Sequence, residues 1–428
     1  MSTLTAEHPP AAPAAVRPLA GPHPTPPPPE PERPRRRVLV ALVVLALLLA
    51  VFGRSALLGG GSETAAAPAV TAPPAEPVTE APPSAEAKAV EAALPELQAF
   101  VSEQRDLEFL APVDVTLLDD EAFREELGVD EELSDLDRDA LKRYEGILKA
   151  LGLLTPNADL ARDMTTGAAE GVLGLYDPST KRLLVRGTEL TPLARSVLVH
   201  ELTHALDDQH FDLHRPEMTE GVEDHLAFRA LGEGDATRVE DAYVAAMSPE
   251  DRASVEQART KVVDGATVEQ QTAYYIDAFP YLDGPTFVTE LAEQGGEAAV
   301  DAAFANPPRS TAEILVPSRY LAGVRGMRMT TADVDGTTFD DGVIGALGLY
   351  LMLQSAVSPE EAALATLAWE GDSYLAWHDG ERTCVMARFV LATPWETDFT
   401  AKLFERWAAR QIDASISAAG IVEVTSCR

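Results

Sequence analysis

The chain has 428 residues and a formal net charge of −35, and residues 1–54 carry six Lys/Arg against three Asp/Glu, so the remainder carries −38. This length is enough for one large or two ordinary domains. A surface that acidic argues against nucleic acid and against anionic membrane surfaces as partners.

The N-terminal region has the features of a polar tail followed by a membrane anchor. Residues 1–37 contain twelve prolines and end in a run of arginines, which predicts a disordered, Pro-rich cytoplasmic tail. The fifteen apolar residues Val38–Phe52 follow, and extension to Leu58, with Arg54 snorkelling to the membrane surface, reaches the length of one span. Because the basic cluster precedes the apolar run, the tail is expected in the cytoplasm and the rest of the chain outside.

We therefore predict a single-pass signal anchor over residues 38–58 in the cytoplasmic membrane. The alternative is a signal peptide that is cleaved, which would give a secreted protein. Residues 59–88 are rich in Ala and Pro and indicate a linker, and residues 89–428 are expected to form an extracytoplasmic folded domain. The abundance of Ala, Pro, Asp and Glu beside few Lys is typical of a high-GC bacterial source.

The first part of the folded domain combines predicted helices with a hairpin. A strand is expected over residues 107–118. Helices are expected over residues 89–101, 121–127 and 135–151. Pro112 places part of that strand near an edge or a bend. Two β-prone runs then flank a turn within residues 172–186, which predicts a β-hairpin. Its strand either only covers the next helix or offers its edge to an extended peptide by β-addition.

The segment after the hairpin carries the pattern His-Glu-x-x-His at His200, Glu201 and His204, inside an uncharged stretch. Thr191 before Pro192 predicts the start of its helix. Histidines at i and i+4 project from one helix face and can bind one ion, and neutral imidazole suits zinc. Glu201 is rotated towards the open position, where a carboxylate can take a proton from water. We therefore predict His200 and His204 as zinc ligands and Glu201 as the catalytic general base; the alternative is two core histidines in an ordinary helix.

Two residues are candidates for the third ligand. His210 completes the spacing H-E-x-x-H-x-x-G-x-x-H, but Asp207 stands where that pattern has the glycine that allows a sharp turn. Glu233 lies in an apolar stripe of a helix predicted over residues 219–247, where a zinc ion would compensate a carboxylate that is costly to bury unpaired. The alternative is a glutamate that pairs with Arg229 or Arg238 at the surface. Weaker alternatives near the start of the same helix are Glu220 and Glu223.

The C-terminal part is predicted to contain helices followed by a small antiparallel sheet. Helices are expected over residues 272–279, 284–293, 343–357, 359–368 and 399–411, with a helix cap at 307–311. Residues 373–378 and 383–392 form a predicted hairpin around Asp379-Gly380, and residues 421–427 add a strand. Cys384 and Cys427 lie in these strands, so we expect a disulfide between them, the alternative being two free buried thiols.

The pattern H-E-x-x-H, followed on a second helix by Glu233-Gly234-Asp235-Ala236, resembles the gluzincin class of zinc metallopeptidases. The chain is also similar to a family of bacterial secreted or membrane-anchored metallopeptidase-like proteins without assigned substrates. That similarity spans most of residues 105–412, with matching segments at 200–213, 233–236, 308–315 and 369–372. The resemblance implies one zinc ion held by His200, His204 and Glu233, with Glu201 as the general base.

The gluzincin pattern E-x-x-x-D is absent, because Thr237 stands at its last position. The residue that would orient a ligand imidazole therefore stays open among Asp207, Asp208 and Asp235. His210 is a candidate for the same role, for a donor to the oxyanion, or for a plain structural residue. Further candidates for the oxyanion donor are Tyr274, Tyr275, Tyr281, Arg309 and Tyr320.

The expected fold class is α+β, with a mostly helical zincin-like domain, the β-hairpin before the active-site helix, and a C-terminal sheet subdomain from about residue 369 to 428. The expected function is a membrane-anchored extracytoplasmic peptidase that hydrolyses peptides or proteins with a zinc-activated water and Glu201 as base. One alternative is an inactive peptidase-fold protein used for binding or scaffolding in the cell envelope. The other is a zinc hydrolase that acts on amide bonds of the cell wall.

Overall fold

The computed structural model describes residues 85–127, 135–159, 172–215, 218, 221–260, 275–276, 278–330, 334 and 336–428. The predicted tail, the predicted anchor and most of the predicted linker lie outside these ranges, as does most of the helix expected over 272–279. Among the helices within these ranges, none combines the length and the apolarity that a bilayer crossing requires.

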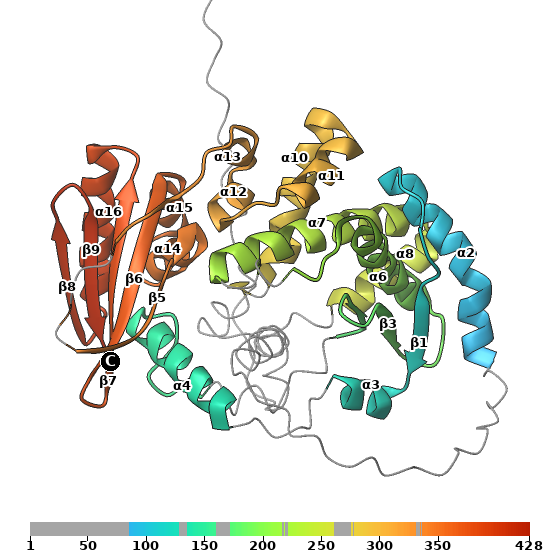
Figure 1. Cartoon of the computed structure of the whole chain (residues 1–428), viewed down its shortest axis with the longest axis horizontal. Helices are drawn as coiled ribbons and strands as arrows, with labels where there is room; N and C mark the ends of the chain where they lie inside the picture. The colour runs from blue at the N-terminus through green and yellow to red at the C-terminus, as the bar shows by residue number, and fades with distance from the viewer. Residues whose placement is uncertain are drawn as a thin grey trace, which may run out of the picture.

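Helices and two separate sheets make up the described part of the chain, as the α+β prediction expected at this level. A three-stranded sheet lies early in the chain and a six-stranded sheet lies late. Figure 1 shows the two sheets on opposite sides of the molecule, with helix α7 (Val222–Ala246) between them.

The three-stranded sheet consists of β1 (Asp114–Leu118), β3 (Arg182–Arg186) and β2 (Gly174–Asp177), in that spatial order. Strand β2 pairs antiparallel with β3, which confirms the predicted hairpin, and β1 pairs parallel with β3. The strand predicted over 107–118 was too long. Its first half contains Pro112, which has no N–H, and the amides of Leu110 and Ala111 donate to the Gln209 side chain at 2.7 and 3.1 Å instead of to a strand.

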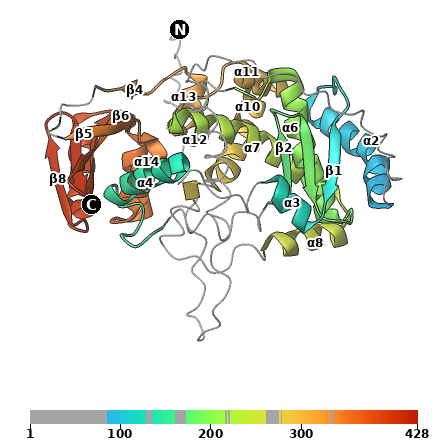
Figure 2. The same ribbon diagram turned by 60° about the horizontal axis from the view of Figure 1, so that its bottom comes forward.

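Helices α2 (Ala85–Arg105), α3 (Asp120–Glu126) and α6 (Pro192–Phe211) pack against this sheet, and α8 (Pro249–Thr260) packs against α6. Helix α6 begins as predicted, because the Thr191 side chain accepts from the Ala194 amide at 3.1 Å and Pro192 occupies the first turn. The apolar faces of α2, β3 and α6 enclose a small core that includes Leu97, Leu183 and Leu198. Figure 2 shows α6 beside β2.

The six-stranded sheet has the order β4-β6-β7-β9-β8, and β5 also pairs with β6. Its strands are β4 (Met327–Arg328), β5 (Thr337–Gly342), β6 (Trp369–Asp379), β7 (Arg382–Leu391), β8 (Asp413–Ala418) and β9 (Val422–Cys427). The predicted hairpin is β6–β7, and the predicted disulfide joins Cys384 and Cys427, which face each other on β7 and β9. The sheet begins earlier than residue 369, because β4 and β5 belong to it. Strand β5 escaped prediction because it is largely polar and exposed, without an alternating apolar face. Strand β8 was missed although Ala414, Ile416 and Ala418 alternate with polar residues, because its apolar face is short and two of its three side chains are only methyl groups.

The remaining helices cover this sheet and α7. They are α4 (Asp135–Ala150), α10 (Gly284–Gly295), α11 (Glu297–Ala305), α12 (Thr311–Leu315), α13 (Pro317–Leu321), α14 (Gly345–Gln354), α15 (Pro359–Leu367) and α16 (Pro394–Ala408). Helix α16 starts five residues before the predicted Phe399, because Thr393 caps it and Pro394 occupies its first turn.

Helix α7 connects the two cores and so fixes the position of Glu233. Leu226, Ala230 and Leu231 belong to the large core under the C-terminal sheet, whereas Val239 belongs to the small core around α6. A Cβ at Gly234 would lie 2.3 Å from the carbonyl carbon of Gly284, so this glycine lets α7 and α10 cross in close contact.

Candidate metal centre

Helices α6 and α7 bring three of the predicted site residues together. His200 and His204 lie one turn apart on α6, and Glu233 faces them from α7. The Glu233 Oε2 atom lies 3.2 Å from His200 Nε2 and 3.3 Å from His204 Nε2. The three ligand atoms all lie within 4.8 Å of one another. The structure therefore contains a preformed His-His-Glu cluster at the place where the sequence predicts a metal.

The donor set and its spacing fit a zinc ion. Nitrogen and oxygen ligands at zinc distances around a tetrahedral ion lie about 3.3 Å apart, which matches both measured separations. Two imidazoles and one carboxylate are a known zinc donor set that leaves a position open for water. The side chains of His204 and Glu233 are 15% and 16% exposed, so the cluster is shielded but reachable from solvent.

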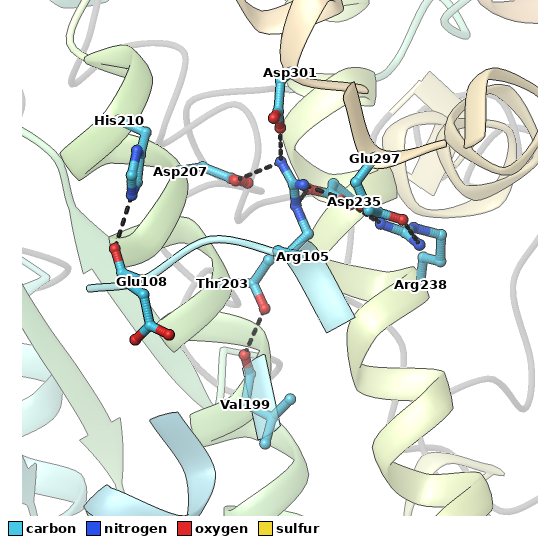
Figure 3. Close-up of polar contacts among 10 residues, drawn as sticks. All are labelled: Arg105, Glu108, Val199, Thr203, Asp207, His210, Asp235, Arg238, Glu297 and Asp301. Carbon is cyan, nitrogen blue, oxygen red and sulfur yellow. Dashed lines mark hydrogen bonds and ion pairs between the residues drawn. The ribbon is translucent and has the colours of Figure 1, made fainter. Parts of the chain in front are cut away.

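His210 lies away from this cluster. Helix α6 continues through Asp207 to Phe211 instead of turning after His204, so His210 points from a different face of the helix. Its Nε2 atom lies 2.8 Å from the backbone oxygen of Glu108 (Figure 3). Of the two candidates for the third position, Glu233 is the one that meets the two histidines.

The electrostatic environment keeps Glu233 ionised. Burial raises the pKa of its carboxyl, but the hydrogen bonds to His200 and His204 outweigh burial and hold this pKa well below its usual value. Arg229 adds a positive charge, with its Nη2 atom 3.5 Å from Glu233 Oε1. A carboxylate that is charged at neutral pH is the form that binds a cation.

Glu240 is a site residue that the sequence reasoning missed. Its Oε2 atom lies 3.2 Å from His200 Nδ1, the ring nitrogen opposite the cluster. Arg259 of α8 contacts the other oxygen of Glu240 at 2.6 Å and so fixes the carboxylate. A carboxylate on the far nitrogen orients an imidazole and makes it a stronger ligand. The available signal was the spacing, since Glu240 follows Glu233 by seven residues and therefore lies on the same face of α7.

Asp235 and Asp207 form a different structure, a buried ion cluster around Arg105 (Figure 3). The Arg105 side chain is fully buried at the end of α2 and contacts four carboxylates at 2.5 to 3.1 Å. These belong to Asp207 on α6, Asp235 on α7, and Glu297 and Asp301 on α11. Arg238 contacts Asp235 and Glu297 at 2.9 and 2.7 Å. The cluster ties together the two helices that carry the histidines and Glu233, because Asp207 and Asp235 lie within one turn of them.

Asp208, the remaining aspartate considered for orienting an imidazole, contacts the hairpin. The Tyr176 hydroxyl donates to Asp208 Oδ2 at 2.6 Å, and Lys181 Nζ lies 2.7 Å from the same oxygen. These contacts attach β2 and the turn after it to α6.

Glu201 lies between α6 and β2. Its side chain is nearly buried, and Oε2 accepts a hydrogen bond from the Tyr176 amide at 2.8 Å. Burial raises the pKa of this carboxyl above its usual value, which brings it nearer to neutrality. A Cβ at Gly174 would lie 2.9 Å from Glu201 Cγ, so the glycine allows the strand to approach the carboxylate. Strand β2 thus positions the carboxylate of Glu201, the predicted general base.

One of the oxyanion-donor candidates lies beside the cluster. The Tyr281 ring stacks on the His200 ring, with centroids 6.2 Å apart and planes 22° apart, and its side chain is 41% exposed. The others have different surroundings: Tyr320 donates to the Asn306 carbonyl, Arg309 contacts Asp224, and Tyr275 lies near Asp283. Tyr274 lies outside the described residues.

Two segments of the C-terminal half, 308–315 and 369–372, lie near the start of α7. The Glu223 carboxylate accepts from the Thr311 amide at 2.9 Å and from its hydroxyl. Asp372 accepts from the amides of Ile344 and Gly345 at 2.7 and 2.8 Å. Glu223 is therefore engaged in joining α7 to the C-terminal half, away from the three-residue cluster. Glu220 lies outside the described residues.

No protein-family model, curated protein or solved structure matched this chain.

Proposed function

We propose that this protein is a zinc-dependent peptidase of gluzincin type, in which His200, His204 and Glu233 hold the ion and Glu201 transfers the proton. The observation that carries the proposal is the position of Glu233 Oε2, at 3.2 and 3.3 Å from the two histidine Nε2 atoms. Helices α6 and α7 bring these three donor atoms to the spacing of zinc ligands. The carboxylate of Glu201, the residue after His200, is not part of the cluster and is held by the Tyr176 amide.

The residues around the cluster supply the remaining chemistry. A zinc ion held here would act as a Lewis acid and lower the pKa of a bound water. Glu201 then accepts the proton of the attacking water and passes it to the leaving amine. The Tyr176 amide holds Oε2 of Glu201, which leaves Oε1 for the transfer. We assign Tyr281 as the donor to the negative charge that develops on the carbonyl oxygen.

A peptide is the substrate that suits the edge of β2. This strand is at the edge of its sheet. The Arg186 amide donates to the Leu173 carbonyl at 2.9 Å, so Gly174 and Tyr176, at alternate positions, direct their amides away from β3. The Tyr176 amide reaches Glu201, which puts this edge along the proposed catalytic carboxylate. An extended peptide added to the edge would bring its backbone to the site by β-addition.

The proposed location is outside the cytoplasmic membrane, on the anchor predicted over residues 38–58. The Cys384–Cys427 disulfide supports an oxidising compartment, where such bonds form and persist.

The first experiment measures zinc content and peptide hydrolysis of the full-length protein after dialysis against metal-free buffer. We expect about one zinc ion per chain in the wild type and in Glu201→Gln, with hydrolysis lost only in the variant. Glu233→Ala is expected to lose zinc, whereas His210→Ala retains it. A wild-type protein that is folded but binds no zinc refutes the proposal. Cleavage of cell-wall amides without cleavage of peptides would favour the cell-wall hydrolase, and one zinc without any hydrolysis the binding protein.

A further inference from the structure

The first turn of α7 meets the C-terminal half of the chain at a joint that contains two buried carboxyl groups. Glu223 on α7 is 6% exposed, and Asp372 on β6 is fully buried. Among the described residues, neither carboxyl group forms an ion pair with an arginine, a lysine or a histidine. Because burial of two negative charges without a cation is costly, the closed joint requires that one of the two groups keeps a proton.

The hydrogen-bond donors around the joint determine which group is protonated. Asp372 accepts from three neutral donors: the amides of Ile344 and Gly345 at 2.7 and 2.8 Å, and Trp369 Nε1 at 2.8 Å. Glu223 accepts from a single described residue, through the amide and the hydroxyl of Thr311. Donors favour the ionised form of a carboxyl group. Burial therefore raises the pKa of Asp372 only to about 6, whereas burial, with a smaller contribution from the charge of Asp372, raises the pKa of Glu223 to about 8.

The two sides of the joint are in direct contact. Gly345 has a φ of +80°, and a Cβ at this position would overlap the Glu223 carboxyl group. The Thr311 hydroxyl, which donates to Glu223, accepts from the Leu347 amide at 3.0 Å. No water fits between Gly345 and Glu223. An ionised Glu223 can therefore be hydrated only if α12 and the start of α14 move away from α7.

The other charged groups near the joint have partners or are neutral. Asp224 on the first turn of α7 contacts Arg309 at 3.2 Å, and Glu313 on α12 contacts Arg325 at 2.9 Å. Burial lowers the pKa of His225 to about 4, so this imidazole is neutral at higher pH. The loss of a proton from the joint around neutral pH is therefore assigned to the buried glutamate.

We propose that this joint is a pH-sensitive switch, in which α12 and the start of α14 separate from the first turn of α7 when Glu223 loses its proton. In the open joint the carboxyl group is hydrated and returns to its ordinary pKa of 4.5. A rise in pH from about 4.5 to about 8 therefore favours the open form increasingly, and a further rise adds nothing. The predicted location outside the cytoplasmic membrane would expose this switch to the pH of the surroundings. The inference does not depend on the zinc-peptidase proposal.

Hydrogen–deuterium exchange of the metal-free full-length protein, read by mass spectrometry at pH 6 and pH 8, tests the switch. The amides of Thr311 and Leu347 donate hydrogen bonds within the joint, so peptides that contain them report its opening. After correction for the intrinsic exchange rate, their opening constant should rise at least about 10-fold from pH 6 to pH 8, since one proton allows at most about 100-fold over two pH units. At pH 8 it should also exceed the opening constant of residues 385–389, which lie inside the C-terminal sheet.

Two variants assign the effect to one carboxyl group. Glu223→Gln keeps the size of the side chain and an acceptor for Thr311 but cannot ionise, so its opening constant should change less than about 3-fold between the two pH values. Asp224→Asn is the matched control on the same helix turn and should keep the wild-type rise, because its side chain is 33% exposed and contacts Arg309.

An equal rise in the wild type and in Glu223→Gln overturns the assignment to Glu223. Joint peptides that exchange no faster than residues 385–389 at pH 8 overturn the local opening, because the chain then unfolds as a whole. This second comparison uses only the wild type, so it tests the switch even if Glu223→Gln does not fold.

Discussion

Replacement of Arg105 by methionine tests whether the buried ion cluster holds the two zinc-site helices in place. Methionine keeps most of the length and the apolar volume of the side chain but removes the guanidinium. Asp235 keeps Arg238 as a partner at 2.9 Å, whereas Asp207, which is fully buried, loses the guanidinium that it contacts at 3.1 Å. Removal of one partner of a buried ion pair costs about 3–5 kcal/mol of unfolding free energy.

The lower end of that range is the better estimate for Arg105→Met. Burial and the nearby Asp235 already hold the pKa of Asp207 well above its usual value. Asp207 can therefore take up a proton when the guanidinium is absent, which limits the cost to about 3 kcal/mol. Glu297 and Asp301 add less, because their side chains are 22% and 30% exposed.

The assay is urea unfolding of the full-length protein in the presence of a chelator, followed by zinc affinity from competition with a chelating dye. Arg382→Met is the matched control, since Arg382 also contacts two carboxylates but its side chain is 48% exposed, and its loss should cost less than about 1 kcal/mol. Arg105→Met is also expected to weaken zinc binding at least about 10-fold, the size of effects seen for residues that support metal ligands. The reasoning is refuted if Arg105→Met costs no more than Arg382→Met, or if zinc affinity is unchanged in a destabilised variant.

Three further predictions concern Glu240, Glu223 and the disulfide. Glu240→Gln should lower zinc affinity about 10- to 100-fold at pH 7, because the carboxylate on His200 Nδ1 is lost; an affinity equal to that of the wild type in the same dye competition would exclude the orienting role. Burial raises the pKa of Glu223 to about 8, so the folded state holds a proton that the unfolded state has released, and stability falls as the pH rises from about 4.5 to 8. Glu223→Gln should remove that decline, so the difference in urea midpoint, variant minus wild type, should be more positive at pH 8 than at pH 5. A variant midpoint that falls further below the wild type at pH 8 than at pH 5 would show that the ionised carboxylate stabilises the fold. The double variant Cys384→Ser with Cys427→Ser removes a bond between residues 43 positions apart, which in the chain-entropy model contributes about 4 kcal/mol to the free energy of unfolding. Its melting temperature should therefore lie well below that of the oxidised wild type. A reducing agent should lower the wild-type melting temperature to the same value.

The sequence determined the parts of this protein that depend on neighbours along the chain. The His-Glu-x-x-His pattern places two imidazoles on one face of α6 because the helical repeat fixes that spacing. Thr191 and Pro192 start the helix through their own backbone chemistry, and the turn residues between β2 and β3 close the hairpin. The two cysteines lie in alternating runs that become paired strands, so their disulfide was also predictable.

Only the tertiary structure decided which distant residue completes the cluster. His210 and Glu233 were both open by sequence, and the choice depends on whether α6 turns after His204 and on how α7 crosses it. The packing of α7 into two cores fixes that crossing, and the close contact of Gly234 with Gly284 fixes α7 against α10. Glu240 and the partners of Arg105 are determined in the same way, since a carboxylate contacts a chosen imidazole or guanidinium only after the helices have packed. The strength of such contacts depends on burial and distance, and neither quantity is encoded in the spacing of residues along the chain.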